Sequence, residues 1–293
     1  LRRGLESSEA GEQASAADLE SARLSAQAEL ATNYFLLRAL DVQKQLLDDS
    51  VAAFQKSLDL TRNRYVAGVA GKVDVAQAET QLRSTQAQAV NTGVQRAQLE
   101  HAIALLIGKA PSDFSLPPAP MRLVMPAIPV GVPSELLERR SDIAAAERRV
   151  AAANAQIGVA QSAYFPSLTL TGAVGSQATD ASLWFTTASR FWSIGPALAL
   201  TLFDAGLRRA QTDQAIAAYD ATVAEYRQTV LNGFREVEDN LAALRILEEE
   251  AKIQDQAVRA ARESVLLTTN QYKAGIVSYL NVAIVQTAQL NNE

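Results

Sequence analysis

The chain has 293 residues with 27 basic and 32 acidic side chains, so its formal net charge is −5. This balance lacks the basic stripe that nucleic-acid binding requires, so we expect no nucleic-acid partner. There is no cysteine and a single histidine, His101, which excludes a disulfide, a thiolate metal site and a cysteine nucleophile. No phosphate loop, catalytic triad or paired-carboxylate site stands out. We therefore expect neither an enzyme nor a cofactor or metal site.

No stretch approaches the roughly 20 apolar residues of a membrane-spanning helix. The chain starts at Leu1 rather than at Met, and the last helical pattern runs to Glu293. We therefore expect the sequence to be a piece of a longer protein, with any targeting signal outside it.

The prolines divide the chain into helical and non-helical parts. All nine lie between Pro111 and Pro196, and proline breaks helix interiors. The flanks are rich in good helix formers, which predicts long helices over residues 5–64 and about 203–270. A heptad-like stripe, typical of packed helices, runs along the second: Val223, Tyr226, Val230, Phe234, Val237, Leu241 and Leu244. Helices of this length, on the order of 100 Å, favour a coiled-coil tube or a spacer.

One phrase occurs twice. RYVAGVAGKVDVAQ at 64–77 returns as QYKAGIVSYLNVAI at 271–284, and about a third of residues 24–80 are identical at the same offset. A single duplication this long indicates two similar halves rather than a solenoid. Gly68 and Gly275 suit the positive φ of a helix end, while Asp74 and Asn281 suit the start of the next helix. Each copy therefore predicts the tip of a helical hairpin, which either only makes the turn or also contacts a partner.

The middle begins with a proline-rich connector, residues 111–134. A helix is expected after it, starting at Pro133 and Ser134, with Ser134 as the N-cap.

Two alternating stretches follow, PSLTLTGAVGSQ at 166–177 and WSIGPALALTLF at 192–203. Each has one apolar face and one face of small or polar residues, and each is near the ~9–11 residues of a transmembrane β-strand. The apolar faces comprise Leu168, Leu170, Gly172 and Val174, and Ile194, Pro196, Leu198, Leu200 and Leu202. Between the strands we place Trp184, Phe185, Phe191 and Trp192 as an interfacial aromatic girdle. The alternative is a soluble hairpin with one buried face. Two strands cannot close a barrel, so either further strands or several chains would be needed.

Several motifs together resemble the TolC-like outer-membrane factors. The pattern Y-x-A-G-x-x-S-x-L-x-V begins at Tyr272, and residues 132–170, 202–211 and 234–244 are similar to other signatures of the branch that serves RND-type drug-efflux pumps, the NodT-type outer-membrane efflux lipoproteins. The resemblance covers essentially the whole chain. One departure is Ser141, where the family usually has proline before Asp142.

The resemblance implies a mainly α-helical protomer with a β-hairpin, in a homotrimer. Long helices would form a periplasmic α-barrel, continuous with a shared 12-stranded transmembrane β-barrel of which this chain holds the second hairpin only. The implied segments are a first helical hairpin at 1–110, a connector and equatorial helical segment at 111–163, the outer-membrane β-hairpin at 164–204 and a truncated second helical hairpin at 205–293. The lipidated cysteine of many members would lie before Leu1.

The implied function is passive export through the outer membrane of a Gram-negative bacterium, with a large periplasmic part. An inner-membrane RND-type pump would pass substrate through a periplasmic adaptor (membrane fusion protein) into the duct, and the tips would open when the adaptor docks. The implied docking residues are Tyr65, Ala67, Gly68 and Val69 in one tip and Tyr272, Ala274, Gly275, Ile276, Ser278 and Leu280 in the other. Asp74 is a candidate gate residue, with a helix cap as the alternative. The implied lipid-facing residues are Leu168, Leu170, Val174, Leu198, Leu200 and Leu202.

Two other hypotheses stay open. One is the same fold in type I protein secretion, and the other is a periplasmic adaptor or structural coiled coil. An adaptor has one helical hairpin between β domains, whereas this chain predicts two related tips and a strand pair. The charges of residues 138–149 are expected to form a solvated, paired helix face, and His101 is expected to have a structural place.

Overall fold

The computed structural model describes residues 1–121 and 139–293. These residues form two compact units. The first contains residues 1–22 and the described part of 131–236, and the second contains the described part of 23–130 together with 237–293. Both long helices contribute residues to both units. The division into the four segments expected from sequence stays a prediction.

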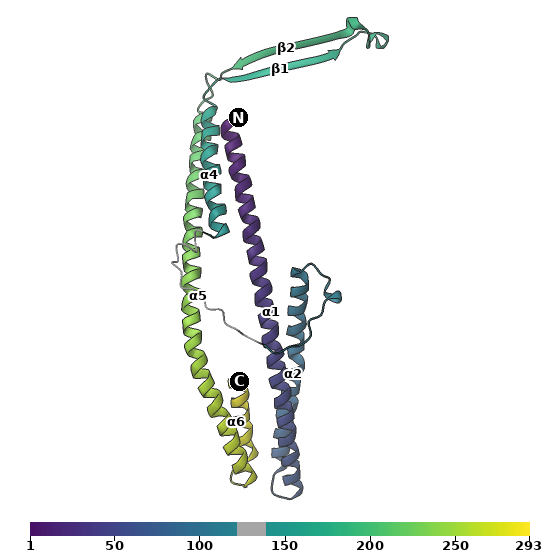
Figure 1. The fold of residues 1–293 in the computed structure, drawn as a ribbon, viewed down its shortest axis with the longest axis vertical. Helices are drawn as coiled ribbons and strands as arrows, with labels where there is room; N and C mark the ends of the chain where they lie inside the picture. The colour runs from purple at the N-terminus through teal and green to yellow at the C-terminus, as the bar shows by residue number, and fades with distance from the viewer. Residues whose placement is uncertain (122–138) are drawn as a thin grey trace. The chain divides into compact units, whose positions relative to one another are not determined.

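The elements follow one another as a helical hairpin, a connector, a short helix, a β-hairpin and a second helical hairpin (Figure 1). Their bounds are α1 Arg2–Val66, α2 Lys72–Leu106, η1 Pro111–Asp113, α4 Ser141–Ser162, β1 Ser167–Ser176, η2 Ala181–Leu183, η3 Thr187–Ser189, β2 Arg190–Ala199, α5 Leu207–Lys273 and α6 Tyr279–Asn292. The two long helices are confirmed, with 65 and 67 residues. Within the described residues, no helix combines the length and the apolar character needed to cross a membrane.

Helix α4 begins at Ser141, with Arg140 as its N-cap. The start expected at Pro133 and Ser134 lies outside the described residues. Ser141 takes the first helical position, where proline is favoured because its missing N–H has no partner in any case. Arg140 stabilises this start by ion pairs to Asp142 at 2.7 Å and to Glu236 of α5 at 2.8 Å.

Small side chains bring α4 against the first turns of α1. Ala145, Ala146 and Ala155 are buried on α4, and the Ser7 hydroxyl donates to the carbonyl of Ala152 at 3.2 Å. The charged residues of this region form exposed pairs, such as Arg149 with Asp18. The expectation of a solvated, paired face is therefore confirmed only in part: Arg149 pairs with α1 and Arg140 with Glu236 of α5, and Arg140 and Asp142 are partly buried. Glu138 lies outside the described residues.

The two strands pair antiparallel, from Ser167 opposite Ala199 to Ser176 opposite Arg190. The expected span of the second strand was wrong by two residues at its start and by four at its end. Pro166 precedes β1 and has no N–H to extend the ladder, so Leu200 and Leu202 lie beyond the strand.

The aromatic cluster also changes with this register. Phe191 and Trp192 belong to β2, and only Trp184 and Phe185 lie in the loop between the strands.

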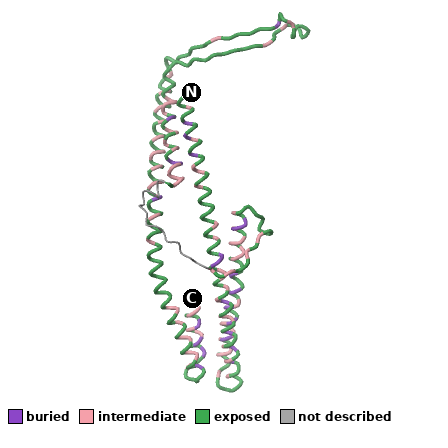
Figure 2. The backbone as a smooth tube through the Cα atoms, in the orientation of Figure 1, coloured by how far each residue is buried: buried purple, intermediate pink, exposed green. Residues whose placement is uncertain are grey.

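In the second unit, buried residues lie along the helices of both hairpins toward their tips (Figure 2). This core comprises Phe54 and Leu58 of α1, Ala78 and Leu82 of α2, Tyr272 of α5, and Tyr279 and Val282 of α6. Fully burying one such large apolar side chain contributes about 1.5–3 kcal/mol. The core therefore holds the two hairpins together as one packed tip.

Charged side chains attach the connector to α1 and α2. Asp41 accepts hydrogen bonds from Arg38 Nη1 at 2.9 Å, from Arg96 Nε at 2.7 Å and from the Ala119 amide at 3.3 Å. Glu100 accepts from the Leu116 amide and pairs with Arg96. We call Arg38, Asp41, Arg96 and Glu100 the connector clamp.

Candidate functional site at the paired hairpin tips

The two turns have the same backbone geometry. Gly68 has φ 75° and Gly275 has φ 77°, which is the left-handed region that glycine adopts at little cost. The next amide, of Val69 or Ile276, donates to the carbonyl five residues earlier at 2.8 and 3.0 Å. This bond is typical of a Schellman helix end, so the turn predicted from the repeat is confirmed in both copies.

The helices that follow begin at equivalent positions. Gly71 is the N-cap of α2 and Ser278 that of α6. The Gly71 amide donates to the Asp74 carboxylate at 3.0 Å, and Asn281 donates to the Ser278 hydroxyl at 3.3 Å. This capping bond accounts for Asp74 in the described chain, and its gate role stays a prediction.

The second tip packs onto the first through Tyr272. Its hydroxyl donates to Thr61 Oγ1 at 3.1 Å, and the Arg64 guanidinium lies 4.8 Å from its ring centroid. Arg64 Nη1 also donates to the Lys273 carbonyl at 2.9 Å. Two residues of α1, Thr61 and Arg64, and two of α5, Tyr272 and Lys273, therefore join the two hairpins by hydrogen bonds and a cation–π contact.

Tyr279 lies beside Tyr272, with ring centroids 5.7 Å apart in an edge-on arrangement. It is fully buried, and its hydroxyl has no hydrogen-bond partner among the described residues. Burial, followed by the nearby Tyr272, raises the pKa of Tyr279 to about 12. A buried hydroxyl without a partner costs free energy, so this site stores a local penalty within the core.

Nine of the ten predicted docking residues are exposed, but Tyr272 is not. Its side chain is 3% exposed, whereas its repeat counterpart Tyr65 is 46% exposed. The difference arises because α6 carries Tyr279 where α2 carries Lys72, so the second tip has an aromatic core and the first does not. Tyr272 therefore joins the hairpins and does not present a surface.

The exposed tips share an apolar pattern that the sequence argument only partly found. Val69 and Ile276 are repeat counterparts, as are Val73 and Leu280, and all four are exposed. Val66, also exposed, adds to the first tip. The sequence did not identify two exposed apolar residues of the first tip, Val66 and Val73. It also did not identify the residues that pack against Tyr272 between the hairpins, which are Thr61, Arg64 and Tyr279. Only Val73 had a signal, its repeat equivalence to Leu280.

The register of the β-hairpin places the apolar residues of both strands on one face. Leu168 lies opposite Leu198, and Val174 opposite Trp192. Partners directly opposite in an antiparallel pair point to the same side. The large apolar residues of this face are all exposed: Leu168, Leu170, Val174, Trp192, Ile194 and Leu198. The described residues of the single chain therefore leave this apolar face open.

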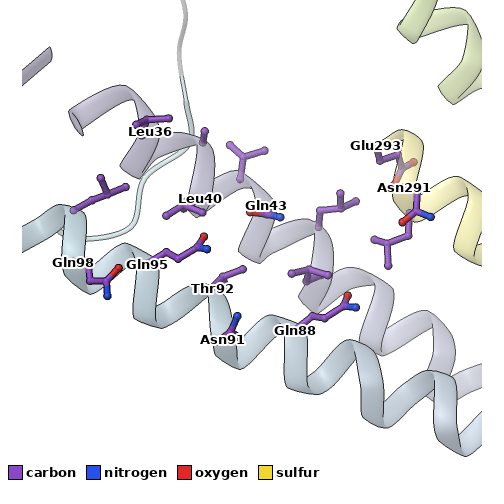
Figure 3. A pocket seen from close by; sticks show the side chains of 16 residues that line it. Leu36, Leu40, Gln43, Gln88, Asn91, Thr92, Gln95, Gln98, Asn291 and Glu293 are labelled. Atoms are coloured by element: carbon purple, nitrogen blue, oxygen red, sulfur yellow. The ribbon is translucent and has the colours of Figure 1, made fainter. Parts of the chain in front are cut away.

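A groove of about 960 Å³ lies between α1 and α2, beside the end of α6 (Figure 3). Amide side chains such as Gln43, Gln88 and Gln95 point into it among leucines. Among the described residues that line it, only Glu293 is ionisable. The groove therefore offers no acid–base pair for catalysis, and it contains none of the predicted tip residues.

Metal ligands do not gather in the described part of the chain, where no group of three or more His, Cys, Asp or Glu could hold an ion. His101 is exposed on α2.

Two long helical hairpins with matching tips, carried on one chain with an amphipathic β-hairpin, define the protomer fold of a TolC-like outer-membrane channel. The chain belongs to the outer membrane efflux protein family, whose model matches residues 1–109 and 132–293.

Relatives and solved structures agree with this family. The chain is 35% identical over 258 residues to the solvent efflux pump outer membrane protein SrpC of Pseudomonas putida, covering 87% of this chain and 54% of that protein. It is 34% identical over 278 residues to the outer membrane protein OprJ of Pseudomonas aeruginosa, covering 93% and 57%. It superposes on the outer-membrane channel OprN with a TM-score of 0.90 and 32% identity, covering 99% of this chain and 66% of that one. The chain thus spans about half the length of the curated relatives it matches.

Proposed function

We propose that the whole protein is the outer-membrane channel of a tripartite efflux pump, a passive duct from the periplasm to the exterior. The observation that carries the proposal is the strand register, which gathers exposed apolar residues of both strands on one face. The same chain supplies long helical hairpins whose tips are exposed. A duct of this kind needs a lipid-facing wall and a helical extension, and it performs no chemistry.

The proposed assembly is a homotrimer in the outer membrane of a Gram-negative bacterium. Two antiparallel strands leave two open edges, so further strands are needed to close a barrel. In the proposed trimer each protomer supplies four strands, which together form the 12-stranded barrel. Exposed apolar residues such as Leu231 and Leu247 on α5 fit surfaces that neighbouring protomers cover. Light scattering of the full-length protein, extracted from outer membrane in detergent, tests this. A trimer supports the proposal, and a soluble or monomeric product contradicts it.

The proposed partners are a periplasmic adaptor, which docks on the tips, and an inner-membrane RND-type pump. The docking surface comprises Tyr65, Ala67, Gly68, Val69, Ala274, Gly275, Ile276, Ser278 and Leu280. Val69 in the first tip and Ile276 in the second are repeat counterparts, and both are apolar and exposed. This equivalence supports an adaptor that contacts both tips in the same way.

Single cysteines test the docking, because the native chain has none. Val69→Cys and Ile276→Cys are preferable to changes at Gly68 or Gly275, where the positive φ would strain a side chain. We expect both variants to crosslink to the adaptor in cells. Val90→Cys, exposed on α2 but away from the tip, is the matched control. No adduct at either tip position, with the channel present in the outer membrane, would refute the docking role.

Opening would separate the two hairpins on adaptor docking. The contacts of Tyr272 with Thr61 and of Arg64 with Lys273 would then be broken, and Asp74 is the proposed acidic residue of the gate. The type I secretion alternative has less support, because the matched relatives are efflux pump proteins by name. The adaptor alternative has less support because the chain carries two related tips.

A further inference from the structure

The loop end of the β-hairpin carries an arginine on its apolar face. Register places Arg190 opposite Ser176, one same-face pair beyond Val174 and Trp192. Along β2 the face therefore changes from aliphatic Leu198 and Ile194 to aromatic Trp192 and then to a cation. This order matches the change from hydrocarbon to interface to headgroups across a membrane leaflet.

The position of Arg190 along the strand agrees with that order. From Arg190 to Leu198 the strand spans nine residues, and a tilted strand crosses the hydrocarbon in ~9–11 residues. A strand rises about 3.3 Å per residue, so Arg190 lies roughly 7 Å beyond Trp192. If Leu198 marks one boundary of the apolar layer, Arg190 lies at the other.

Among the described residues, Arg190 has no contact that would explain it. Between Phe165 and Phe203 the only ionisable residues are Asp180 and Arg190. Asp180 accepts hydrogen bonds from the amide and hydroxyl of Ser182 at 3.4 and 3.3 Å. Arg190 is exposed, and within the described chain its guanidinium has neither an ion pair nor a hydrogen bond. A free guanidinium next to an exposed indole matches a phosphate group, which arginine binds through two parallel hydrogen bonds.

We propose that Arg190, together with Trp192, binds the phosphate headgroup of an anionic lipid in the leaflet that the hairpin loop reaches. This inference rests on the proposed function, because it requires the apolar face to lie in a membrane. The ligand is a membrane lipid rather than soluble phosphate, because the apolar face leads directly into the site.

Lipid binding by the full-length protein in a non-ionic detergent tests the inference. The probe is diphosphoryl lipid A, counted per trimer by native mass spectrometry, with phosphatidylcholine as the zwitterionic reference. A juxtamembrane arginine changes binding of an anionic lipid by about fivefold. We expect Arg190→Gln to lower the preference for lipid A by about that factor. Arg190→Lys keeps the charge and should restore part of it.

Arg227→Gln, an equal loss of charge at an exposed position of α5, is the matched control and should bind like the wild type. Equal binding by wild type and Arg190→Gln would overturn the inference, as would full displacement of lipid A by excess inorganic phosphate. Failure to recover a trimer from the outer membrane would instead overturn the proposed function. If the trimer is present and all variants bind equally, only the lipid site is wrong.

Discussion

Removing the Asp41 carboxylate is expected to release the connector from the helices. In the connector clamp, Asp41 is 5% exposed and accepts from two arginines and one amide. Asp41→Ala would leave Arg38 and Arg96 largely buried without this partner. Breaking a buried ion pair costs about 3–5 kcal/mol, but the Arg96 side chain is 19% exposed. We therefore expect about 2–3 kcal/mol, or a roughly 30- to 150-fold increase in local opening.

Hydrogen–deuterium exchange of the full-length protein measures this opening. The informative amide is that of Leu116, because its acceptor is Glu100 and the substitution leaves that acceptor in place. Faster exchange of the Ala119 amide would not report opening of the connector, because the substitution removes the acceptor of that amide. Asp48→Ala is the matched control, because the ion pair of Asp48 with Lys44 is exposed and contributes little. Exchange at Leu116 within threefold of wild type would refute the clamp.

The clamp should also respond to acid. Burial alone would raise the pKa of Asp41, but hydrogen bonds from Arg96, the Ala119 amide and Arg38 outweigh it and hold the pKa below its ordinary 3.8. Burial alone would also raise the pKa of Glu100. Hydrogen bonds from the Leu116 amide and Ser115, together with the charge of Arg96, outweigh burial and hold this pKa below its ordinary 4.5. A carboxylate whose pKa is lower in the folded state than in the unfolded state stabilises the fold at pH values above its ordinary pKa. This stabilisation is lost as the pH falls through the lowered pKa. Pepsin cleavage of residues 112–121 should therefore accelerate only below about pH 4. Cleavage that is already fast at pH 5 would contradict this.

The remaining predictions concern the core and the strands. Tyr279→Phe removes a buried hydroxyl without a partner and should leave thermal stability unchanged or raise it. Tyr272→Phe loses the hydrogen bond to Thr61 and should lower stability by about 1 kcal/mol. The opposite order of the two melting temperatures would contradict this reading. Leu170→Arg on the apolar face should reduce outer-membrane assembly by a cost of about 2–4 kcal/mol. Thr171→Arg on the other face should be tolerated, and greater loss with Thr171→Arg than with Leu170→Arg would show that the faces are assigned wrongly. Immunoblots of outer-membrane fractions measure the assembly.

Local rules determined much of the architecture from sequence. The absence of proline from the flanks predicted both long helices, and the spacing of the repeat predicted two turns with glycine at positive φ. Alternation in the strands predicted which residues share a face, because the side-chain period of a strand is two. Each of these properties depends on residues close together in the chain.

Contacts between distant residues were decided only by the tertiary structure. Tyr65 and Tyr272 are equivalent in the repeat, but one is exposed and the other is buried, because the second hairpin packs onto the first across Tyr279. The four residues of the connector clamp lie on two helices, and nothing in their local sequence indicates that Asp41 reaches the Ala119 amide. The end of β2 depends on Pro166 across the sheet. Sequence therefore determined the elements and their turns, whereas burial and partners came from packing, which joins residues that chain order does not relate.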